Sequence, residues 1–249
     1  DEALRIKPEE TKIPVAQQFT NLSTHLGQLV KLTLFYFKMV FKEVPFVAIV
    51  VSGMLLLVVN AVNLNEFFGT NSHPTTYNIL TLLSGFNLFF MIIAVLYSGE
   101  LIWKERAINL NLIIDAMPIP DFIALISKFL GLILVYVVLL AGLIISGVLI
   151  QMSQGYFKFE LGIYFSRLYT ETLSFLVLYT LFSMFVQVIV NNKFVGFAVA
   201  IAFLIAVDFF PQIGLEHSLF RFGSSSLETY SDMNTYGHFI TSFSWFKVY

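Results

Sequence analysis

The stretch FIALISKFLGLILVYVVLLAGLIISGVLI, residues 122–150, decides the fold of this chain. Its single charged side chain is Lys128, which stands close to its beginning. A helix needs about 20 apolar residues to cross about 30 Å of hydrocarbon, so this stretch is long enough to span a bilayer with some tilt. A lone strand would leave its backbone groups unpaired in lipid, and we therefore expect a helix.

Other apolar stretches flank this one on both sides. They cover residues 44–63, 77–99, 173–190 and 194–215. Together the five stretches predict an all-α fold, a polytopic transmembrane helical bundle of about five full spans. The chain turns apolar again over residues 243–249, and we expect it to be a fragment of a longer protein in which a sixth span starts there.

The composition independently favours a membrane protein. Hydrophobic residues make up 57% of the chain and charged residues only 12%, with 28 Phe and 11 Tyr. Ordinary soluble domains are about 25% charged, and a soluble fold of this size has no means of hiding so much apolar surface. The net charge of −2 and the lack of a basic tract argue against a nucleic-acid partner. The absence of Cys excludes disulfides and thiolate metal sites.

The N-terminal region divides into two parts. Residues 1–18 are charged and contain prolines, which predicts a cytoplasmic linker. Residues 19–43 carry Lys31, Lys38 and Lys42 on one helical face. The apolar residues roughly opposite are Leu22, Leu26, Leu29, Tyr36 and Val40. This pattern predicts an amphipathic interfacial helix whose lysines contact membrane lipid, although a plain lead-in to the first span remains an alternative.

The distribution of Lys and Arg predicts the orientation of the chain. With five spans, the N-terminal segment, residues 100–121 and residues 191–193 share one side of the membrane. Ten of the 14 Lys and Arg belong to that side, counting Lys128. Cytoplasmic segments carry an excess of these residues, so we expect a multi-pass protein with its N-terminus in the cytoplasm.

Residues 98–121, SGELIWKERAINLNLIIDAMPIPD, lie between the second and third predicted spans. The segment begins with four charged residues, Glu100, Lys104, Glu105 and Arg106. An i,i+4 pair joins Glu100 to Lys104 in the favourable order. The apolar face contains Leu101, Ile108 and Leu112, and the segment stops at Pro118 and Pro120. This predicts a short amphipathic helix able to dock on a soluble partner, while an ordinary solvated loop remains an alternative.

The segment contains a charged cluster, then an apolar helix and then a Pro-x-Pro sequence. This order resembles the permeases of ATP-binding-cassette exporters of the type-2 class. In that family an interfacial helix precedes the first span, a coupling helix between spans two and three contacts the ATPase, and a re-entrant segment lies between spans five and six. The corresponding segments here are residues 19–43, 98–121 and about 208–240. The coupling residues that the resemblance implies are Glu100, Lys104, Glu105, Arg106, Ile108, Leu112, Pro118 and Pro120.

Three shorter strings carry a narrower resemblance. Residues 97–106 (YSGELIWKER), 190–193 (VNNK) and 230–239 (YSDMNTYGHF) are similar to large bacterial proteins, typical of Bacteroidetes, that join permease-type membrane halves to a C-terminal zinc aminopeptidase. This resemblance implies the bacterial inner membrane as the location and a peptidase beyond residue 249. It also implies two partners, a second permease half and an ATPase subunit that carries ATP and Mg.

No catalytic motif occurs in this stretch of sequence. The four His residues, His25, His73, His217 and His238, form no His-Glu-x-x-His pair, and there is no phosphate-binding Gly-x-x-x-x-Gly-Lys-Ser/Thr loop. We therefore expect no enzyme activity, no metal and no cofactor in this chain itself. Transport is the first functional hypothesis, and a membrane anchor for the zinc aminopeptidase domain is the alternative.

The fifth predicted span ends at a possible external vestibule. Asp208 precedes Pro211, which breaks a helix, and Arg221 follows in an expected outer cap over residues 216–240. Asp208 either faces the vestibule or is hydrated at the outer interface, and the sequence leaves both interpretations open.

Overall fold

The computed structural model of the chain describes residues 21–62, 74–109, 120–214, 222, 236–237 and 239–248. These residues are overwhelmingly helical, and no strand occurs among them, which confirms the predicted all-α fold. Four helices in this part of the chain are long and apolar enough to cross a membrane: Val44–Val62, Thr76–Ala107, Asp121–Ser153 and Leu161–Val190. The prediction of membrane-spanning helices is therefore confirmed at this level.

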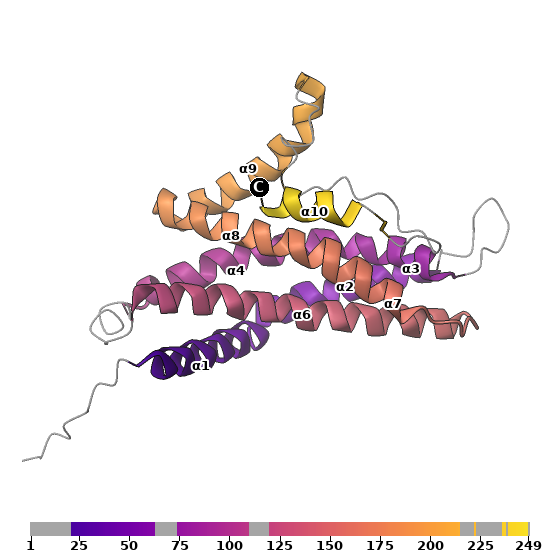
Figure 1. The fold of residues 1–249 in the computed structure, drawn as a ribbon, viewed down its shortest axis with the longest axis horizontal. Helices are drawn as coiled ribbons and strands as arrows, with labels where there is room; N and C mark the ends of the chain where they lie inside the picture. The colour runs from indigo at the N-terminus through magenta and orange to yellow at the C-terminus, as the bar shows by residue number, and fades with distance from the viewer. Residues whose placement is uncertain are drawn as a thin grey trace, which may run out of the picture.

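Successive spans run in opposite directions along the long axis of the bundle (Figure 1). Helix α2 (Val44–Val62) is followed by a continuous helical run of α3 (Thr76–Leu83), a 3₁₀ turn η2 (Ser84–Phe86) and α4 (Asn87–Ala107). Helix α6 (Asp121–Ser153) leads to a second composite run, which contains α7 (Leu161–Phe165), a π-helical segment η3 (Ser166–Thr172) and α8 (Leu173–Val190). Helix α9 (Lys193–Phe209) begins against α4 and α8 and then leaves the bundle.

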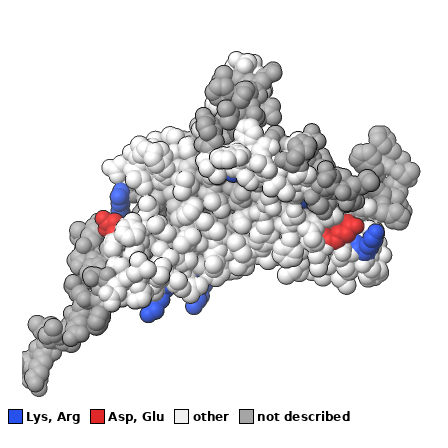
Figure 2. Space-filling view, in the orientation of Figure 1, with Lys and Arg blue, Asp and Glu red and all other residues white. Residues whose placement is uncertain are grey.

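The alternating directions give the bundle two ends. We call the end where α2, α6 and α9 begin and α4 and α8 finish the charged end, and the other the opposite end. Figure 2 shows that Lys, Arg, Asp and Glu gather towards the ends and the lower edge of the visible face, while its middle is almost free of them. Many large apolar side chains of α2, α6 and α8 are exposed, as a lipid-facing surface requires.

Helix α1 (Leu22–Phe41) packs along the first half of α6 (Figure 1). Gly131 of α6 makes this close approach possible, because a Cβ at that position would lie 3.0 Å from the Tyr36 Cβ and 3.2 Å from the Thr33 carbonyl oxygen. Tyr36 and Val40 are buried within the bundle, whereas Leu22 is 78% exposed. Helix α1 therefore belongs to the bundle, and its placement at a lipid interface stays a prediction.

Two expected boundaries are wrong. Residues 98–107 do not start a separate cytoplasmic helix, because α4 continues without a break to Ala107. Residues 161–172, which lie between the predicted spans 122–150 and 173–190, are helical and continuous with α8, so the connection at the opposite end covers only residues 154–160. In both places the polar side chains obtain partners within the bundle, which allows the helices to extend past the apolar stretches.

The connection between α8 and α9 is a tight hairpin at Asn191 and Asn192, between the predicted spans 173–190 and 194–215. Asn191 adopts the left-handed region with φ 49°, which asparagine tolerates better than most residues. The Asn192 side chain accepts hydrogen bonds from the Phe194 and Val195 backbone N–H groups, at 3.1 and 3.3 Å, and so caps α9.

The fifth predicted span corresponds to α9. Its apolar part, Lys193–Val207, is shorter than the four candidate spans, so a count of five spans stays a prediction. Pro211 lies in the 3₁₀ turn η4 (Phe210–Ile213) directly after α9, in agreement with the expected helix break. Helix α10 (Phe239–Val248) begins four residues before the final apolar run, residues 243–249, and covers most of it. The linker 1–18 and most of the outer cap 216–240 lie outside the described residues.

Candidate functional site at the charged end

The last two turns of α4 form the centre of a polar network at the charged end. They carry Glu100, Lys104, Glu105 and Arg106, the charged cluster that the sequence singled out. Each of these side chains contacts a different part of the chain. The network therefore links α4 to the α1–α2 junction, to α6, to the α8–α9 turn and to the start of α9.

Glu105 is the most connected member of this network. Its Oε1 accepts a hydrogen bond from the Tyr36 hydroxyl at 2.7 Å, and its Oε2 binds the Lys128 ammonium at 2.6 Å. Both charged side chains are largely shielded, with relative exposures of 9% for Lys128 and 19% for Glu105. Burial, and after it the bond to Glu105, raises the pKa of Tyr36, so its hydroxyl stays protonated and donates.

The predicted i,i+4 pair between Glu100 and Lys104 does not form. Lys104 instead binds Glu43, in the junction between α1 and α2, and Glu100 binds Lys193 at 2.5 Å. Exposed i,i+4 pairs contribute only about 0.3–0.5 kcal/mol, so partly shielded partners from neighbouring helices compete with them easily. The packing of the bundle supplies these partners, and no sequence spacing reveals them.

Among the described members of the predicted coupling site, Arg106 and Ile108 are the ones that face solvent. Arg106 donates to Asn191 Oδ1 at 3.3 Å, and its guanidinium lies 5.0 Å from the centre of the Trp103 ring. Ile108 is 63% exposed. Since the other cluster members are engaged in ion pairs, these two side chains are the ones most available to a partner.

A buried polar clamp lies beneath this network. Gln187 of α8 is fully buried, and its Oε1 accepts from the Trp103 indole N–H at 3.0 Å. The side chain fits between two glycines: a Cβ at Gly196 would lie 2.4 Å from Gln187 Oε1, and one at Gly99 would lie 2.9 Å from Gln187 Nε2. Three helices, α4, α8 and α9, therefore approach closely around one amide.

The neighbouring turns of the same helices continue this polar contact. The hydroxyls of Ser98 and Ser183 lie 2.5 Å apart, and Tyr136 of α6 pairs with Thr180 at 2.8 Å. All four groups are buried. Inter-helix hydrogen bonds in apolar surroundings hold helices in one register. The clamp and these pairs thus make the charged end a firmly connected part of the bundle.

The remaining predicted residues are dispersed. Lys31, Lys38 and Lys42 are exposed, the first two on α1 and the third at its C-terminal cap. Pro120 directly precedes α6. Leu112, Pro118 and Arg221 lie outside the described residues, as does the Asp208 side chain, although its backbone belongs to α9. The vestibule composed of Asp208, Pro211 and Arg221 therefore stays a prediction.

Sequence reasoning missed several members of the network. Tyr36 was predicted only as a member of the apolar face, and Glu43 and Trp103 received no role. A weak signal for Glu43 existed, since it directly precedes the first span on the side where Lys104 was expected. Gln187 gave no signal beyond being a polar residue within an apolar stretch.

Comparisons of the chain with protein-family models, with curated proteins and with solved structures found no match.

Proposed function

We propose that this chain is the permease subunit of an ATP-driven exporter in a bacterial inner membrane. In this proposal, a separate ATPase subunit binds at the charged end, and a second permease half completes the pathway. The proposed family rests on the resemblance to type-2 exporters, and the proposed coupling role rests on the network around α4.

The observation that carries the proposal is the connection of α4. This helix reaches the charged end without interruption, and its last two turns bind Glu43, Lys128 and Lys193 on three other elements. A displacement applied at the end of α4 would therefore be transmitted to α2, α6 and α9 together. Such mechanical linkage is what the conversion of ATPase motion into helix movement requires.

Charge supports a cytoplasmic position of the charged end. Among the described residues of α1 to α9, the Lys and Arg on that side are Lys31, Lys38, Lys42, Lys104, Arg106, Lys128 and Lys193. The opposite end has Lys158 and Arg167. Because Lys and Arg accumulate on the cytoplasmic side, this distribution favours a cytoplasmic charged end, where an ATPase has access to ATP.

Site-directed crosslinking tests the proposal directly. The chain has no Cys, so a single cysteine at the exposed position Ile108 provides a unique reactive group. In membranes containing the full parent protein, we expect this cysteine to capture a subunit with a phosphate-binding loop and ATPase activity. A cysteine at Lys158, on the opposite end, is the matched control and should capture no such subunit.

The variant Arg106→Glu adds a functional readout. Among the described residues, the Arg106 side chain pairs with Asn191 and the Trp103 ring and takes part in none of the three ion pairs of the network, so these should survive the change. We expect the ATPase to keep hydrolysing ATP while export fails, and Lys158→Glu to leave both unchanged. Normal export by Arg106→Glu, together with no ATPase captured at Ile108, would contradict the proposal. It would favour the alternative function, an anchor for a zinc aminopeptidase domain.

A further inference from the structure

Two of the long helical runs contain an irregular segment near the opposite end. The run from Thr76 to Ala107 contains the 3₁₀ turn η2 (Ser84–Phe86), and the run from Leu161 to Val190 contains the π-helical segment η3 (Ser166–Thr172). Irregular turns within long helices often occur at functional sites. The two segments belong to different helices, yet the residues at their ends line the same space.

That space is a hollow of about 180 Å³ between α4 and α8. Its polar lining comes from Asn87, which follows η2, and from Glu171 and Thr172, which end η3. The apolar lining residues are Phe90, Met91, Phe175 and Leu176. A water molecule has a share of about 30 Å³ in the liquid, so the hollow is too large for a bare metal ion and has room for the head of a small organic molecule.

Glu171 occupies an unusual depth for a carboxylate. It precedes Val190, at the charged end, by 19 residues of helix, which correspond to about 28 Å at about 1.5 Å per residue. The apolar layer of a bilayer is about 30 Å thick, which places Glu171 close to its far boundary. Ionisable groups are costly in and beside this layer and are retained mainly where they have a function.

Only one oxygen of the Glu171 carboxylate is engaged by the described residues. Oε1 receives Arg167 Nη1 at 3.3 Å and the Tyr236 hydroxyl at 3.2 Å. No hydrogen bond or ion pair from the described part of the chain reaches Oε2. The side chain is about one-third exposed, at 31%, and lines the hollow, so this second oxygen is left to accept a hydrogen bond from a ligand.

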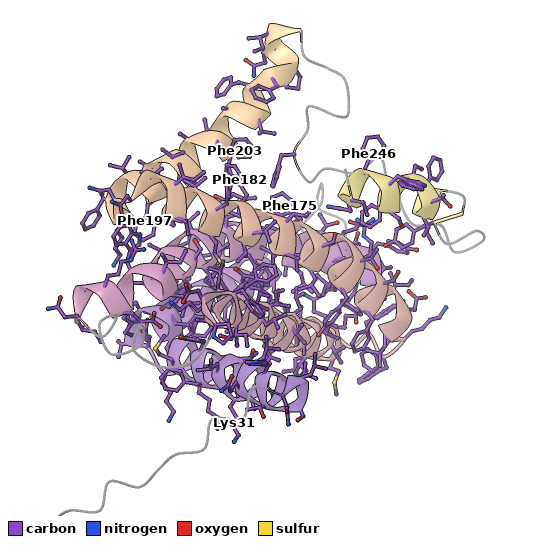
Figure 3. All side chains as sticks on the ribbon, turned by 60° about the vertical axis from the view of Figure 1, so that its left-hand side comes forward. Lys31, Phe175, Phe182, Phe197, Phe203 and Phe246 are labelled. Carbon is purple, nitrogen blue, oxygen red and sulfur yellow. The ribbon has the colours of Figure 1, made fainter. Side chains whose placement is uncertain are left out.

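Aromatic rings form part of the wall next to this carboxylate. Phe175 begins a file of rings along α8 that continues through Tyr179 to Phe182, with centroid separations of 6.0 and 6.5 Å. Figure 3 labels Phe175 and Phe182 along α8, and the centroid of the Phe182 ring lies 4.1 Å from that of the Phe203 ring of α9. Phe90 lies on the α4 side of the hollow. The negative faces of such rings attract ammonium groups.

We propose that the hollow between α4 and α8 binds a primary ammonium group, which donates hydrogen bonds to Glu171 Oε2, to the Asn87 amide oxygen and to the Thr172 hydroxyl. The ligand class is thus a small primary amine or the amine head of a lipid. An ammonium group has three donors, which match these three acceptors. A carboxylate or a fully ionised phosphate has no proton to donate to Glu171 Oε2, and a quaternary ammonium has no N–H to donate.

Arg167 and the Lys247 ammonium on α10 both interact electrostatically with Glu171 and reduce its attraction for a further cation. Affinity in the site therefore comes from directed hydrogen bonds and ring contacts more than from net charge.

The proposal is independent of the exporter function, because an amine can bind here without any ATPase. Its failure and the failure of the exporter proposal are thus separate results.

The test uses the full chain in phosphatidylcholine nanodiscs and ligand-observed NMR. The probe is n-butylammonium, and its neutral counterpart 1-butanol has the same length and apolar surface. We expect saturable binding of n-butylammonium and at least tenfold weaker binding of 1-butanol. Glu171→Gln should weaken amine binding at least tenfold, whereas the control Glu160→Gln, outside the lining of the hollow, should leave it unchanged.

A second variant separates a ligand site from a structural ion pair. Arg167→Gln removes one of the two cations that compete for Glu171, so we expect amine binding to become severalfold tighter. If Arg167→Gln weakens binding as much as Glu171→Gln, or if 1-butanol binds as well as the amine, the proposal is wrong. Phe175→Leu serves as an independent check should Glu171→Gln fail to fold, since loss of the ring should weaken binding severalfold while the carboxylate remains. Unchanged amine binding by Phe175→Leu would overturn the role of the ring wall.

The source of the ammonium group is resolved by the lipid composition. Addition of phosphatidylethanolamine to the nanodiscs should compete with n-butylammonium if the natural ligand is a lipid headgroup. Absence of competition identifies a soluble amine, and both results support the ammonium site.

Discussion

The Tyr36 hydroxyl and the Glu105 carboxylate form a 2.7 Å hydrogen bond across 69 positions of sequence. This bond joins α1 to the end of α4, and Lys128 of α6 binds the same carboxylate through its other oxygen. Glu105 thereby fixes three helices relative to one another. The connection also explains why α1, which by composition alone resembles a surface helix, packs into the bundle.

Tyr36→Phe should destabilise the protein by about 1–2 kcal/mol. The change removes one hydrogen bond to a charged acceptor and keeps the ring in place. The measurement is the free energy of unfolding in detergent micelles. Tyr156→Phe, in the connection at the opposite end, is the matched control, since no side-chain hydrogen bond of Tyr156 occurs among the described residues. An equal effect of both variants would show that the bond to Glu105 contributes nothing specific.

Lys128→Met should be more harmful, by about 3 kcal/mol, because it leaves the shielded Glu105 carboxylate without its counter-charge. The double variant Lys128→Met/Glu105→Gln should recover most of that loss, since no unpaired charge then remains. A double-mutant cycle of unfolding free energies measures this coupling. Simple additivity of the two single changes would be evidence against a shielded ion pair.

Gly196→Ala should disturb the contact of α4, α8 and α9. The added methyl group would lie 2.4 Å from Gln187 Oε1, so either the amide or α9 must move. We expect a loss of about 1–3 kcal/mol, as for overpacking in a core. Gly142→Ala on α6 is the control, because a Cβ there meets nothing within 4 Å, and it should be neutral or slightly stabilising.

The exposed lysines of the first helix predict a dependence on anionic lipid. We expect the thermal unfolding midpoint to be higher in phosphatidylglycerol-containing nanodiscs than in phosphatidylcholine ones. Replacement of Lys31, Lys38 and Lys42 together by Gln should remove most of that difference, since each basic residue near an anionic surface contributes about 1 kcal/mol. Lys158→Gln, at the opposite end, should not. If the triple variant keeps the full lipid effect, these lysines do not contact headgroups.

Glu100 and Lys104 show what a local sequence pattern can and cannot predict. Both lie on α4 at the i,i+4 spacing, yet each binds a residue from another part of the chain. Local spacing identifies which pairs can meet on a helix. It contains no information on competing partners, which arrive through packing from up to 93 positions away.

The surroundings of Glu171 are a second feature that the sequence did not predict. In the sequence Glu171 lies just before the predicted span 173–190, outside every predicted span. In the structure it ends a π-helical segment that continues into α8 and lines a hollow opposite Asn87. Nothing in the local sequence predicts a π-helical turn, because its geometry depends on how the helix packs on its neighbours.

The sequence by itself determined that this is an all-helical membrane protein. Long apolar runs such as residues 122–150 admit only one spanning structure, because lipid offers backbone groups no partner and the helix satisfies its own. Only the tertiary structure decided that α1 packs on α6, which charges pair at the charged end, and that Asn87 and Glu171 share one hollow. These relations depend on side-chain contacts between distant segments, which are set by the packing of whole helices.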